Sequence, residues 1–299
     1  MTPHHSLRSG SGQTGTLYIV ATPIGNLEDI TLRALRVLRG VDVIACEDTR
    51  HTRLLLSRHG VTTALVSYHE HNEAARAADL VARLESGRSV ALVSDAGTPL
   101  LSDPGFTLVR EAVAHEIPVV AVPGPSAITA ALAVSGLPTD RFLFMGFLPR
   151  RSAERRRLLQ EITPLPYTLV FFEAPHRVAQ TLADLRAALG DRTVAVVREL
   201  TKRFEEVIRG RLTDVIGQLR DLPPRGEFTL VVQGAEVVAG EVSQEAVRAH
   251  LATLLNSGVA PTAAAKIVTA AHRIPRRAAY QMALQLRQQA NARTGEHGA

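Results

Sequence analysis

The sequence predicts an α/β fold whose N-terminal part is built on a parallel sheet. Short apolar runs alternate with amphipathic stretches of helical periodicity, which is the pattern of repeated strand–helix–strand units. The core must be aliphatic, because aromatic residues make up only 4% of the chain and tryptophan is absent. Such a core suits strands that are covered by helices on both faces.

The first half of the chain contains four apolar runs that predict buried strands. These runs are Thr16–Thr22, Val43–Cys46, Val90–Ser94 and Pro118–Val122. Helical periodicity predicts helices at Ile30–Arg39, Arg50–Arg58, Asn72–Glu85, Phe106–His115 and Ala127–Val134. Because strands joined by right-handed crossovers run parallel, their carboxyl ends should meet at one edge of the sheet.

Polar and loop-forming residues follow these strands. The segments are Thr22–Asn26, Glu47–His51, Ser94–Gly105 and Val122–Ser126. In parallel sheets, ligands bind at the carboxyl ends of the strands. The concentration of polar residues at this edge therefore predicts a ligand site.

The pattern restarts after a helix stop near Ser135–Pro138. We predict a strand at Phe142–Met145, a basic helix at Arg150–Glu161, a strand at Thr168–Phe172, a helix at Pro175–Leu189 and a strand at Thr193–Arg198, with Glu205–Arg209, Thr213–Leu219 and Phe228–Gln233 completing a second lobe. After Gly240 the chain becomes alanine-rich, and we predict helices at Val242–Leu255, at Thr262–His272 and from about Pro275. This last pattern is compatible with a helix-turn-helix-like module or a three-helix cap.

The length of 299 residues is enough for two domains or more, at roughly 100–200 residues per domain. We expect a disordered tail at 1–14, an N-terminal α/β lobe at 15–137, a C-terminal α/β lobe at 138–239 and a helical extension at 240–299. The sequence holds no apolar run long enough to span a membrane. One cysteine, Cys46, leaves no disulfide framework, which fits a cytoplasmic protein.

The chain is basic, with a formal net charge of +5. Excess positive charge favours polyanionic partners such as nucleic acid. Arginine also outnumbers lysine throughout, and such an arginine-rich composition can arise without any nucleic-acid partner. Charge alone therefore leaves nucleic-acid binding open.

The segment Ser94–Gly105, SDAGTPLLSDPG, carries the strongest local signal. It holds two acidic residues, two glycines and two prolines, more than a turn requires, and its small residues allow a ligand close to the backbone. Its end resembles a helix start, with Asp103 as N-cap and Pro104 at the first helical position. We therefore predict a ligand loop whose last residues begin the next helix.

Several familiar sites are absent from the sequence. No G-x-G-x-x-G or G-x-x-x-x-G-K-[ST] motif follows a strand, and no G-x-S-x-G motif occurs. His69 and His71 have a His-x-His spacing but no third ligand nearby in sequence, so we expect hydrogen-bonding or substrate contact and no metal. Cys46 ends an apolar run, which favours a buried structural thiol.

The combination of motifs resembles a known family. The motifs are TPIGNLEDIT (Thr22–Thr31), EDTRHT (Glu47–Thr52), SYHEHNE (Ser67–Glu73), SDAGTPLLSDPG (Ser94–Gly105), VPGPSA (Val122–Ala127) and FFEAPHR (Phe171–Arg177). Together they resemble the bacterial 16S ribosomal RNA (cytidine-2′-O)-methyltransferases, a branch of the tetrapyrrole (corrin/porphyrin) methylase superfamily. The resemblance covers residues 15–236, and the helical extension is also similar to the family's.

The resemblance implies two α/β lobes with a cleft between them that holds S-adenosylmethionine. It also implies methylation of the 2′-oxygen of a cytidine in the decoding region of 16S rRNA. The expected partner is 16S rRNA within the small ribosomal subunit, and the expected assembly is a homodimer. The residues implied to bind the cofactor are Pro23, Gly25, Asp95, Ala96, Gly97, Thr98, Ser126, Ala127, Phe172, Glu173, Glu199 and Thr229.

A ribose hydroxyl is a poor nucleophile, so a base or a proton-accepting hydrogen bond should assist the transfer. We favour His69 or Glu173, with Asp48, Glu70 and His176 as further candidates. Glu173 could instead fix the cofactor or Arg177, and His69 could instead bind RNA.

Arginine clusters are candidates for contacts with RNA phosphates. They comprise Arg50, Arg150, Arg151, Arg155, Arg156, Arg157, Arg177, Arg276 and Arg277. A solvated helix face is the alternative interpretation of the cluster at 150–157. Two alternative functions also remain: a methylase of small corrinoids or porphyrins, and a non-catalytic RNA-binding factor in ribosome assembly.

Overall fold

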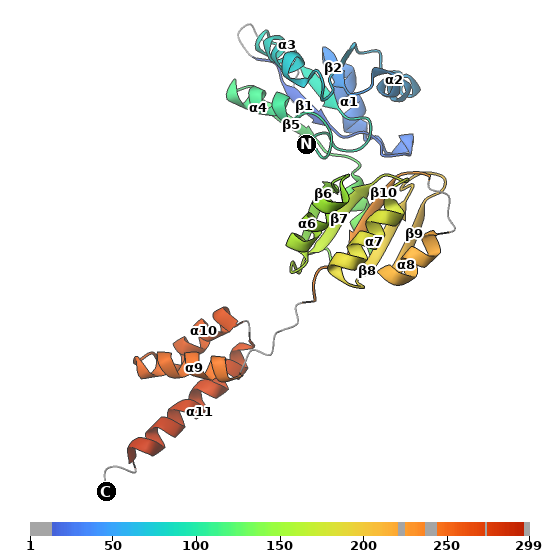
Figure 1. The fold of residues 1–299 in the computed structure, drawn as a ribbon. Helices are drawn as coiled ribbons and strands as arrows, with labels where there is room; N and C mark the ends of the chain where they lie inside the picture. Colours follow the sequence, from blue (N-terminus) through green and yellow to red (C-terminus); the bar gives the residue numbers. More distant parts are fainter. Residues whose placement is uncertain (1–13, 221–224, 237–243, 273, 296–299) are drawn as a thin grey trace. The chain divides into compact units, whose positions relative to one another are not determined.

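The computed structural model describes residues 14–220, 225–236, 244–272 and 274–295 (Figure 1). The predicted tail, apart from residue 14, and the predicted boundary at 239/240 lie outside these ranges. By their contacts the residues form two compact units, Met1–Ala235 and Glu236–Ala299. Within the described ranges, no helix is long and apolar enough to cross a lipid bilayer.

The first sheet is wholly parallel, in the order β3-β2-β4-β1-β5. Its strands are β1 (Leu17–Val20), β2 (Val43–Cys46), β3 (Leu65–Ser67), β4 (Val90–Val93) and β5 (Val119–Val122). The prediction of a parallel sheet is therefore confirmed. Strand β3 is absent from the prediction because its three half-buried residues form no apolar run.

Helices cover both faces of this sheet, as the aliphatic strands require (Figure 1). One apolar core joins the sheet to α1 (Leu32–Gly40) and α2 (Thr49–Arg58). Another joins its other face to α3 (Glu73–Glu85) and α4 (Phe106–Ala114). A short 3-10 helix, η1 (Leu27–Asp29), follows β1.

The second sheet is mixed, in the order β6-β7-β10-β8-β9. Its strands are β6 (Phe142–Phe147), β7 (Thr168–Glu173), β8 (Thr193–Arg198), β9 (Glu206–Arg211) and β10 (Phe228–Val232). Only β6 and β7 pair in parallel, and the other neighbours are antiparallel. The restarted strand–helix pattern therefore does not produce a second parallel sheet, because β10 returns between β7 and β8.

One face of the second sheet packs on α6 (Ser152–Ile162), α7 (Val178–Leu189) and α8 (Leu212–Leu219). Its other face packs on α5 (Ala127–Ser135), through Ile128, Ala131 and Leu132. Helix α5 follows β5 of the first sheet and ends at Gly136, whose left-handed backbone (φ 76°) stops it at the predicted position. This helix therefore starts at the edge of one sheet and covers the other.

The second unit contains α9 (Gln244–Asn256), α10 (Pro261–His272) and α11 (Arg276–Gly295). Val247, Leu251, Ala264, Val268 and Ala283 form its buried core. Proline at the first position of α10 suits a helix start, since that N–H has no helical partner. The predicted helices of the extension are present in this unit.

Candidate active site

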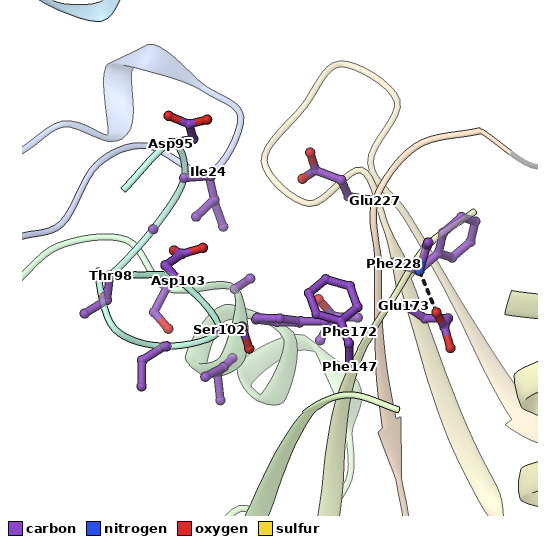
Figure 2. A pocket seen from close by; sticks show the side chains of 18 of the residues that line it. Ile24, Asp95, Thr98, Ser102, Asp103, Phe147, Phe172, Glu173, Glu227 and Phe228 are labelled. Carbon is purple, nitrogen blue, oxygen red and sulfur yellow. Dashed lines mark hydrogen bonds between the residues drawn. The ribbon is translucent and has the colours of Figure 1, made fainter. Parts of the chain in front are cut away.

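A cavity of about 400 Å³ opens where the carboxyl edge of the first sheet faces the second sheet (Figure 2). From the first sheet it is lined by Ile24, the segment Asp95–Thr98, the segment Leu101–Asp103 and the start of α5 at Ser126–Ile128. From the second it is lined by Phe147, the end of β7 with Phe172–Pro175, and Glu227–Thr229. The predicted ligand edge therefore forms one wall of a cavity.

The loops of the first wall are joined by backbone pairing. Thr22 and Gly97 exchange N–H···O bonds of 2.8 and 3.1 Å, which connects the loop after β1 to the loop after β4. Gly97 has a φ of +83°, and a Cβ there would lie 3.2 Å from Ile24 Cγ2. A side chain at this position would be both strained and crowded, so glycine lets the loop lie against Ile24.

The opposite wall is aromatic. Phe147 and Phe172 meet edge to face with their ring centroids 5.8 Å apart, and Figure 2 shows both rings facing the loop that carries Thr98 and Ser102. Apolar walls with a few polar groups are typical of small-molecule sites. None of the described residues that line the cavity is a lysine, arginine or histidine.

The charged residues that line the cavity, among those described, are all acidic. The pKa of Asp103 is raised to about 6. Burial is the largest cause, the carboxylates of Glu47 and Asp95 add to it, and the Ser94 hydroxyl opposes it. Burial also raises the pKa of Glu47, with Asp95 adding to the effect. A cationic ligand would relieve this concentration of negative charge.

The prediction that Asp103 caps the next helix is wrong. Helix α4 begins at Phe106, and its N-cap residue is Gly105, which has no side chain to accept a hydrogen bond from the helix. Instead, Glu73 Oε1 accepts the N–H groups of Gly105 and Thr107, each at 3.1 Å. Because Glu73 satisfies the helix start, Asp103 is left to line the cavity.

Nine of the residues predicted to bind a cofactor line this cavity. They are Asp95, Ala96, Gly97, Thr98, Ser126, Ala127, Phe172, Glu173 and Thr229. Pro23 is buried beside Ile24 and does not line it. Gly25 lines a separate hollow with Thr201 and Lys202. Glu199 also lies outside the cavity, where its carboxylate accepts from Lys202 Nζ and Glu227 N, both at 3.0 Å.

The sequence reasoning missed ten lining residues. They are Ile24, Leu101, Ser102, Asp103, Ile128, Phe147, Ala174, Pro175, Glu227 and Phe228. Six of them already lie inside the quoted motifs: Ile24, Leu101, Ser102, Asp103, Ala174 and Pro175; Ile128 lies one residue beyond VPGPSA. Phe147, Glu227 and Phe228 belong to no motif, and only the pairing of β6, β7 and β10 brings them to the cavity.

Two carboxylates predicted as candidate bases are engaged by other groups. Glu173 is 2% exposed; it accepts hydrogen bonds from the Ala174 N–H at 2.8 Å and the Thr181 hydroxyl at 2.5 Å, and Arg177 lies 3.4 Å away. Asp48 caps α2, and its hydrogen bond and ion pair with Arg50 hold its pKa well below the usual range. Neither carboxylate has the environment of a proton acceptor.

The other candidate bases lie outside the cavity lining. His69 follows β3, and its Nε2 lies 3.2 Å from Asn72 Nδ2, while its Nδ1 is buried with no partner among the described residues. Glu70 is exposed beside it. In the part of the chain that the structure describes, no cluster of His, Cys, Asp or Glu is arranged to hold a metal.

His176 lines a second cavity together with Arg150 and Arg177. This cavity shares Phe147 and Ala174 with the first, so the two adjoin. Arg150 is exposed, whereas Arg177 is largely buried and donates to the carbonyl of Leu148 at 2.8 Å. The structure therefore brings basic side chains to the side of the acidic cavity.

The phosphate contact predicted for Arg155 is not supported. Its side chain is 5% exposed and is paired with the equally buried Asp184 at 2.5 Å. The remaining predicted arginines are at the surface: Arg50 pairs with Asp48, Arg151 with Glu154, Arg156 with Asp184 and Arg157 with Glu161, while Arg276 and Arg277 are exposed at the start of α11.

Two α/β lobes enclose a largely apolar cavity at their strand ends, which is typical of α/β enzymes that bind small molecules. Residues 16–216 match the family model of the tetrapyrrole (corrin/porphyrin) methylases. The chain belongs to this family. The predicted superfamily, fold class and methyltransferase class are therefore confirmed.

Relatives and solved structures agree with this assignment. The chain is 51% identical over 220 residues to the ribosomal RNA small subunit methyltransferase I of Halalkalibacterium halodurans, covering 74% of this chain and 76% of that protein. It is 43% identical to the protein of that name from Escherichia coli O157:H7, covering 95% and 99%. A diphthine synthase structure has the same fold at 18% identity, with a TM-score of 0.56 and coverage of 74% and 90%.

Proposed function

We propose that this chain is an S-adenosylmethionine-dependent methyltransferase of small-subunit ribosomal RNA, acting on the 2′-oxygen of a cytidine in the decoding region of 16S rRNA. The observation that carries the proposal is the agreement of two findings. Relatives named as small-subunit rRNA methyltransferases are 43% identical over 95% of the chain or 51% identical over 74%. The loops that resemble this branch also form a cavity at the edge where ligands bind parallel sheets.

The cavity fits the proposed cofactor in size and chemistry. A volume of about 400 Å³ is in the range of pockets for cofactor-sized ligands. The aromatic and aliphatic walls, Phe172 and Ile24 among them, suit an adenine ring. The acidic side chain of Asp95 suits the positive charge of the cofactor's ammonium or sulfonium group. S-adenosylmethionine, when bound, supplies an electrophilic methyl group.

The chain's own contribution to transfer is positioning. The pairing of Thr22 with Gly97, and the Thr22 hydroxyl donating to Ser94 O at 3.1 Å, hold the loops of β1 and β4 together. Helix α5 begins at this wall and packs its body on the second sheet, which fixes one wall relative to the other. Holding two reactants in line can supply several kcal/mol of the barrier lowering.

The adjoining basic cavity supports RNA as the acceptor. Arg150, Arg177 and His176 lie next to the cofactor cavity, where phosphates flanking a bound nucleotide would need neutralisation. Corrinoid and porphyrin acceptors also carry anionic carboxylates, so the choice of RNA over them rests on the relatives named as rRNA methyltransferases. We further propose a homodimer that acts in the cytoplasm on 16S rRNA within the small subunit.

The test is transfer of a labelled methyl group. The purified protein is incubated with labelled S-adenosylmethionine and small ribosomal subunits that lack the modification, and the product is mapped by mass spectrometry. We expect one methyl group on the ribose of one decoding-region cytidine, and none on subunits that already carry it. Absence of label in RNA, or label on a base, would refute the proposal. Protein-free 16S rRNA and a porphyrin serve as comparison acceptors.

A further inference from the structure

Asp103 occupies a place in the cavity that no helix-capping role explains. It lies in the loop between β4 and α4, and Figure 2 shows its side chain between those of Asp95 and Ser102. The neighbouring Leu100 and Ser102 have φ values of 74° and 70°, which non-glycine residues rarely adopt. Such strained residues persist only where surrounding structure holds them.

The second lobe contributes to holding this loop. Gly146 lies in a bulged part of β6, and a Cβ there would be 3.1 Å from Ser102 Oγ. The loop thus approaches the facing strand closely, beside Phe147. Asp103, the residue after Ser102, therefore lines the first wall close to where that wall approaches the second.

The charged groups around Asp103 leave it without a counter-ion. Glu47 after β2 and Asp95 in the same loop are both acidic and both raise its pKa. Across the cavity, Glu173 is paired with Arg177, and Glu227 lies 3.3 Å from Lys202 Nζ. Since no cation lines the cavity among the described residues, its own acidic groups set the electrostatics at Asp103.

Other acidic residues of the site are engaged elsewhere. Asp95 Oδ1 accepts the Asp48 N–H at 3.1 Å, and Glu227 and Glu173 have the ion-pair partners given above. The Ser94 hydroxyl lowers the pKa of Asp103, but neither a cation nor a backbone N–H adds to this effect. Among the described residues, its carboxylate interacts with the neutral Ser94 hydroxyl and with no cation or backbone N–H.

We propose that Asp103 is the proton acceptor for the hydroxyl that receives the methyl group. This inference rests on the proposed function. The 2′-O–H bond breaks and its proton passes to the Asp103 carboxylate. The oxygen uses the freed electron pair to form the O–CH₃ bond, while the S–CH₃ bond breaks and its electrons stay on sulfur, leaving a neutral thioether. A carboxylate with a pKa of about 6 is ionised yet basic near neutral pH.

The test uses Asp103→Asn, which keeps the shape and removes the basic oxygen, with Asp140→Asn on the exposed surface as the matched control. Single-turnover methylation of small subunits is measured between pH 5 and pH 9 at saturating cofactor. Binding of S-adenosylhomocysteine is measured in parallel. Carbon-13 NMR of the aspartate carboxyls in the ligand-free protein follows the titration of Asp103 directly, independently of activity.

We expect Asp103→Asn to slow transfer by about 100-fold or more while binding S-adenosylhomocysteine within about threefold of wild type. The wild-type rate should fall tenfold per pH unit at low pH, with an apparent pKa no higher than about 6 because the bound cationic cofactor favours the ionised carboxylate, and the variant should lack this dependence. One carboxyl resonance should titrate near 6 and be absent from the variant. Asp140→Asn should behave as wild type.

Three results would overturn the inference. One is a variant rate within threefold of wild type, and another is a rate loss matched by an equal loss of cofactor affinity, which would make Asp103 a cofactor ligand. The third is a titration of Asp103 near 4. If the wild-type protein transfers no methyl group to RNA, the proposed function itself fails and this inference fails with it. If Asp103→Asn does not fold, the wild-type pH profile and NMR titration still decide.

Discussion

The two sheets of the first unit use their charged residues in opposite ways. In the lobe of the parallel sheet, carboxylates such as Glu47 and Asp103 lie at strand ends near one another, and burial raises their pKa values. In the lobe of the mixed sheet, buried carboxylates are neutralised: Asp184 by Arg155 and Glu173 by Arg177. The first lobe thus keeps acidic groups without a paired cation, whereas the second neutralises its own.

Topology explains this difference. All five strands of the parallel sheet end at one edge, so their following loops must converge there. In the mixed sheet β6 and β7 run parallel and the other neighbours antiparallel, so its loops are divided between two edges. The cavity takes only the ends of β6 and β7 and the start of β10. The second lobe therefore supplies a rigid aromatic wall, and the first supplies the polar groups.

The strongest test of the neutralised lobe is Asp184→Ala. This change leaves Arg155, a 5% exposed guanidinium, buried without its carboxylate. We expect the free energy of unfolding to fall by about 3–5 kcal/mol, as for other broken buried pairs. Urea unfolding followed by circular dichroism measures it. Asp214→Ala is the control, since Asp214 is exposed in α8 of the same lobe and forms no ion pair with the residues that the structure describes. An equal loss in both variants would contradict the interpretation.

A smaller effect is expected in the first lobe from Gly97→Ala. Its φ of +83° costs a non-glycine residue energy, and the new Cβ would lie 3.2 Å from Ile24 Cγ2. We expect a loss of about 1–2 kcal/mol in unfolding free energy and weaker binding of S-adenosylhomocysteine.

Gly60→Ala is the matched control for Gly97→Ala. Gly60 also has a positive φ, +62°, but open space surrounds its Cβ position. Both substitutions therefore carry backbone strain, and only the one in the cavity wall adds crowding. Calorimetric titration of the ligand separates them. If Gly60→Ala weakened binding as much as Gly97→Ala, the cavity wall would not depend on close packing at Gly97.

How far these features could be predicted from sequence depends on the range of the interactions behind them. The buried strand Val43–Cys46 and the stop at Gly136 depend on local composition, and both are found as predicted. The cap of α4 comes instead from Glu73, which is distant in sequence, so the local pattern around Asp103 pointed to the wrong residue. Long-range contacts of this kind leave no local signature.

The same reasoning applies to the site. Loops such as Asp95–Thr98 could be located, because a polar segment after a buried strand is a local pattern with a fixed place in a parallel sheet. The burial of Arg155 could not be predicted, since its partner Asp184 belongs to another helix and the surrounding arginines suggested an exposed basic face. Phe147 reaches the cavity only through the pairing of β6 with β7.

Replacing Asp103 should also change stability, by a smaller amount and in the opposite direction. Its pKa rises from the ordinary 3.8 to about 6 on folding, so the folded protein holds more protons than the unfolded chain between these values. Stability should therefore fall as pH rises through this window and then level off. Asp103→Asn should be more stable than wild type at pH 8 by about 1 kcal/mol, the partial exposure reducing the full effect.

Thermal unfolding of both proteins between pH 4 and pH 8 measures this difference. The advantage of the variant should shrink as pH falls from 8 towards 4, because the folded wild-type carboxyl becomes protonated below about pH 6 and no longer carries a buried charge. A variant that is less stable than wild type at pH 8 would show that the carboxylate is favourably paired. The first lobe would then neutralise its acidic groups as the second does.

The smallest expected effect concerns Arg150, the exposed arginine of the basic cavity. Arg150→Ala should leave the unfolding free energy unchanged within about 0.5 kcal/mol, because a surface substitution of this kind removes no buried contact. RNA binding should weaken. The plot of log K against log salt concentration should become shallower by about 0.7–1 in slope, which is the contribution of one phosphate contact.

Arg211→Ala is the control, since Arg211 is 55% exposed on β9 and lies outside both cavities. Filter binding at several salt concentrations gives the two slopes. If Arg150→Ala kept the wild-type slope, the basic cavity would not contact phosphate, and the second lobe would contribute only its aromatic wall. A lower slope for Arg150→Ala alone would instead show that the second lobe, which neutralises its buried charges, keeps an exposed one for the acceptor.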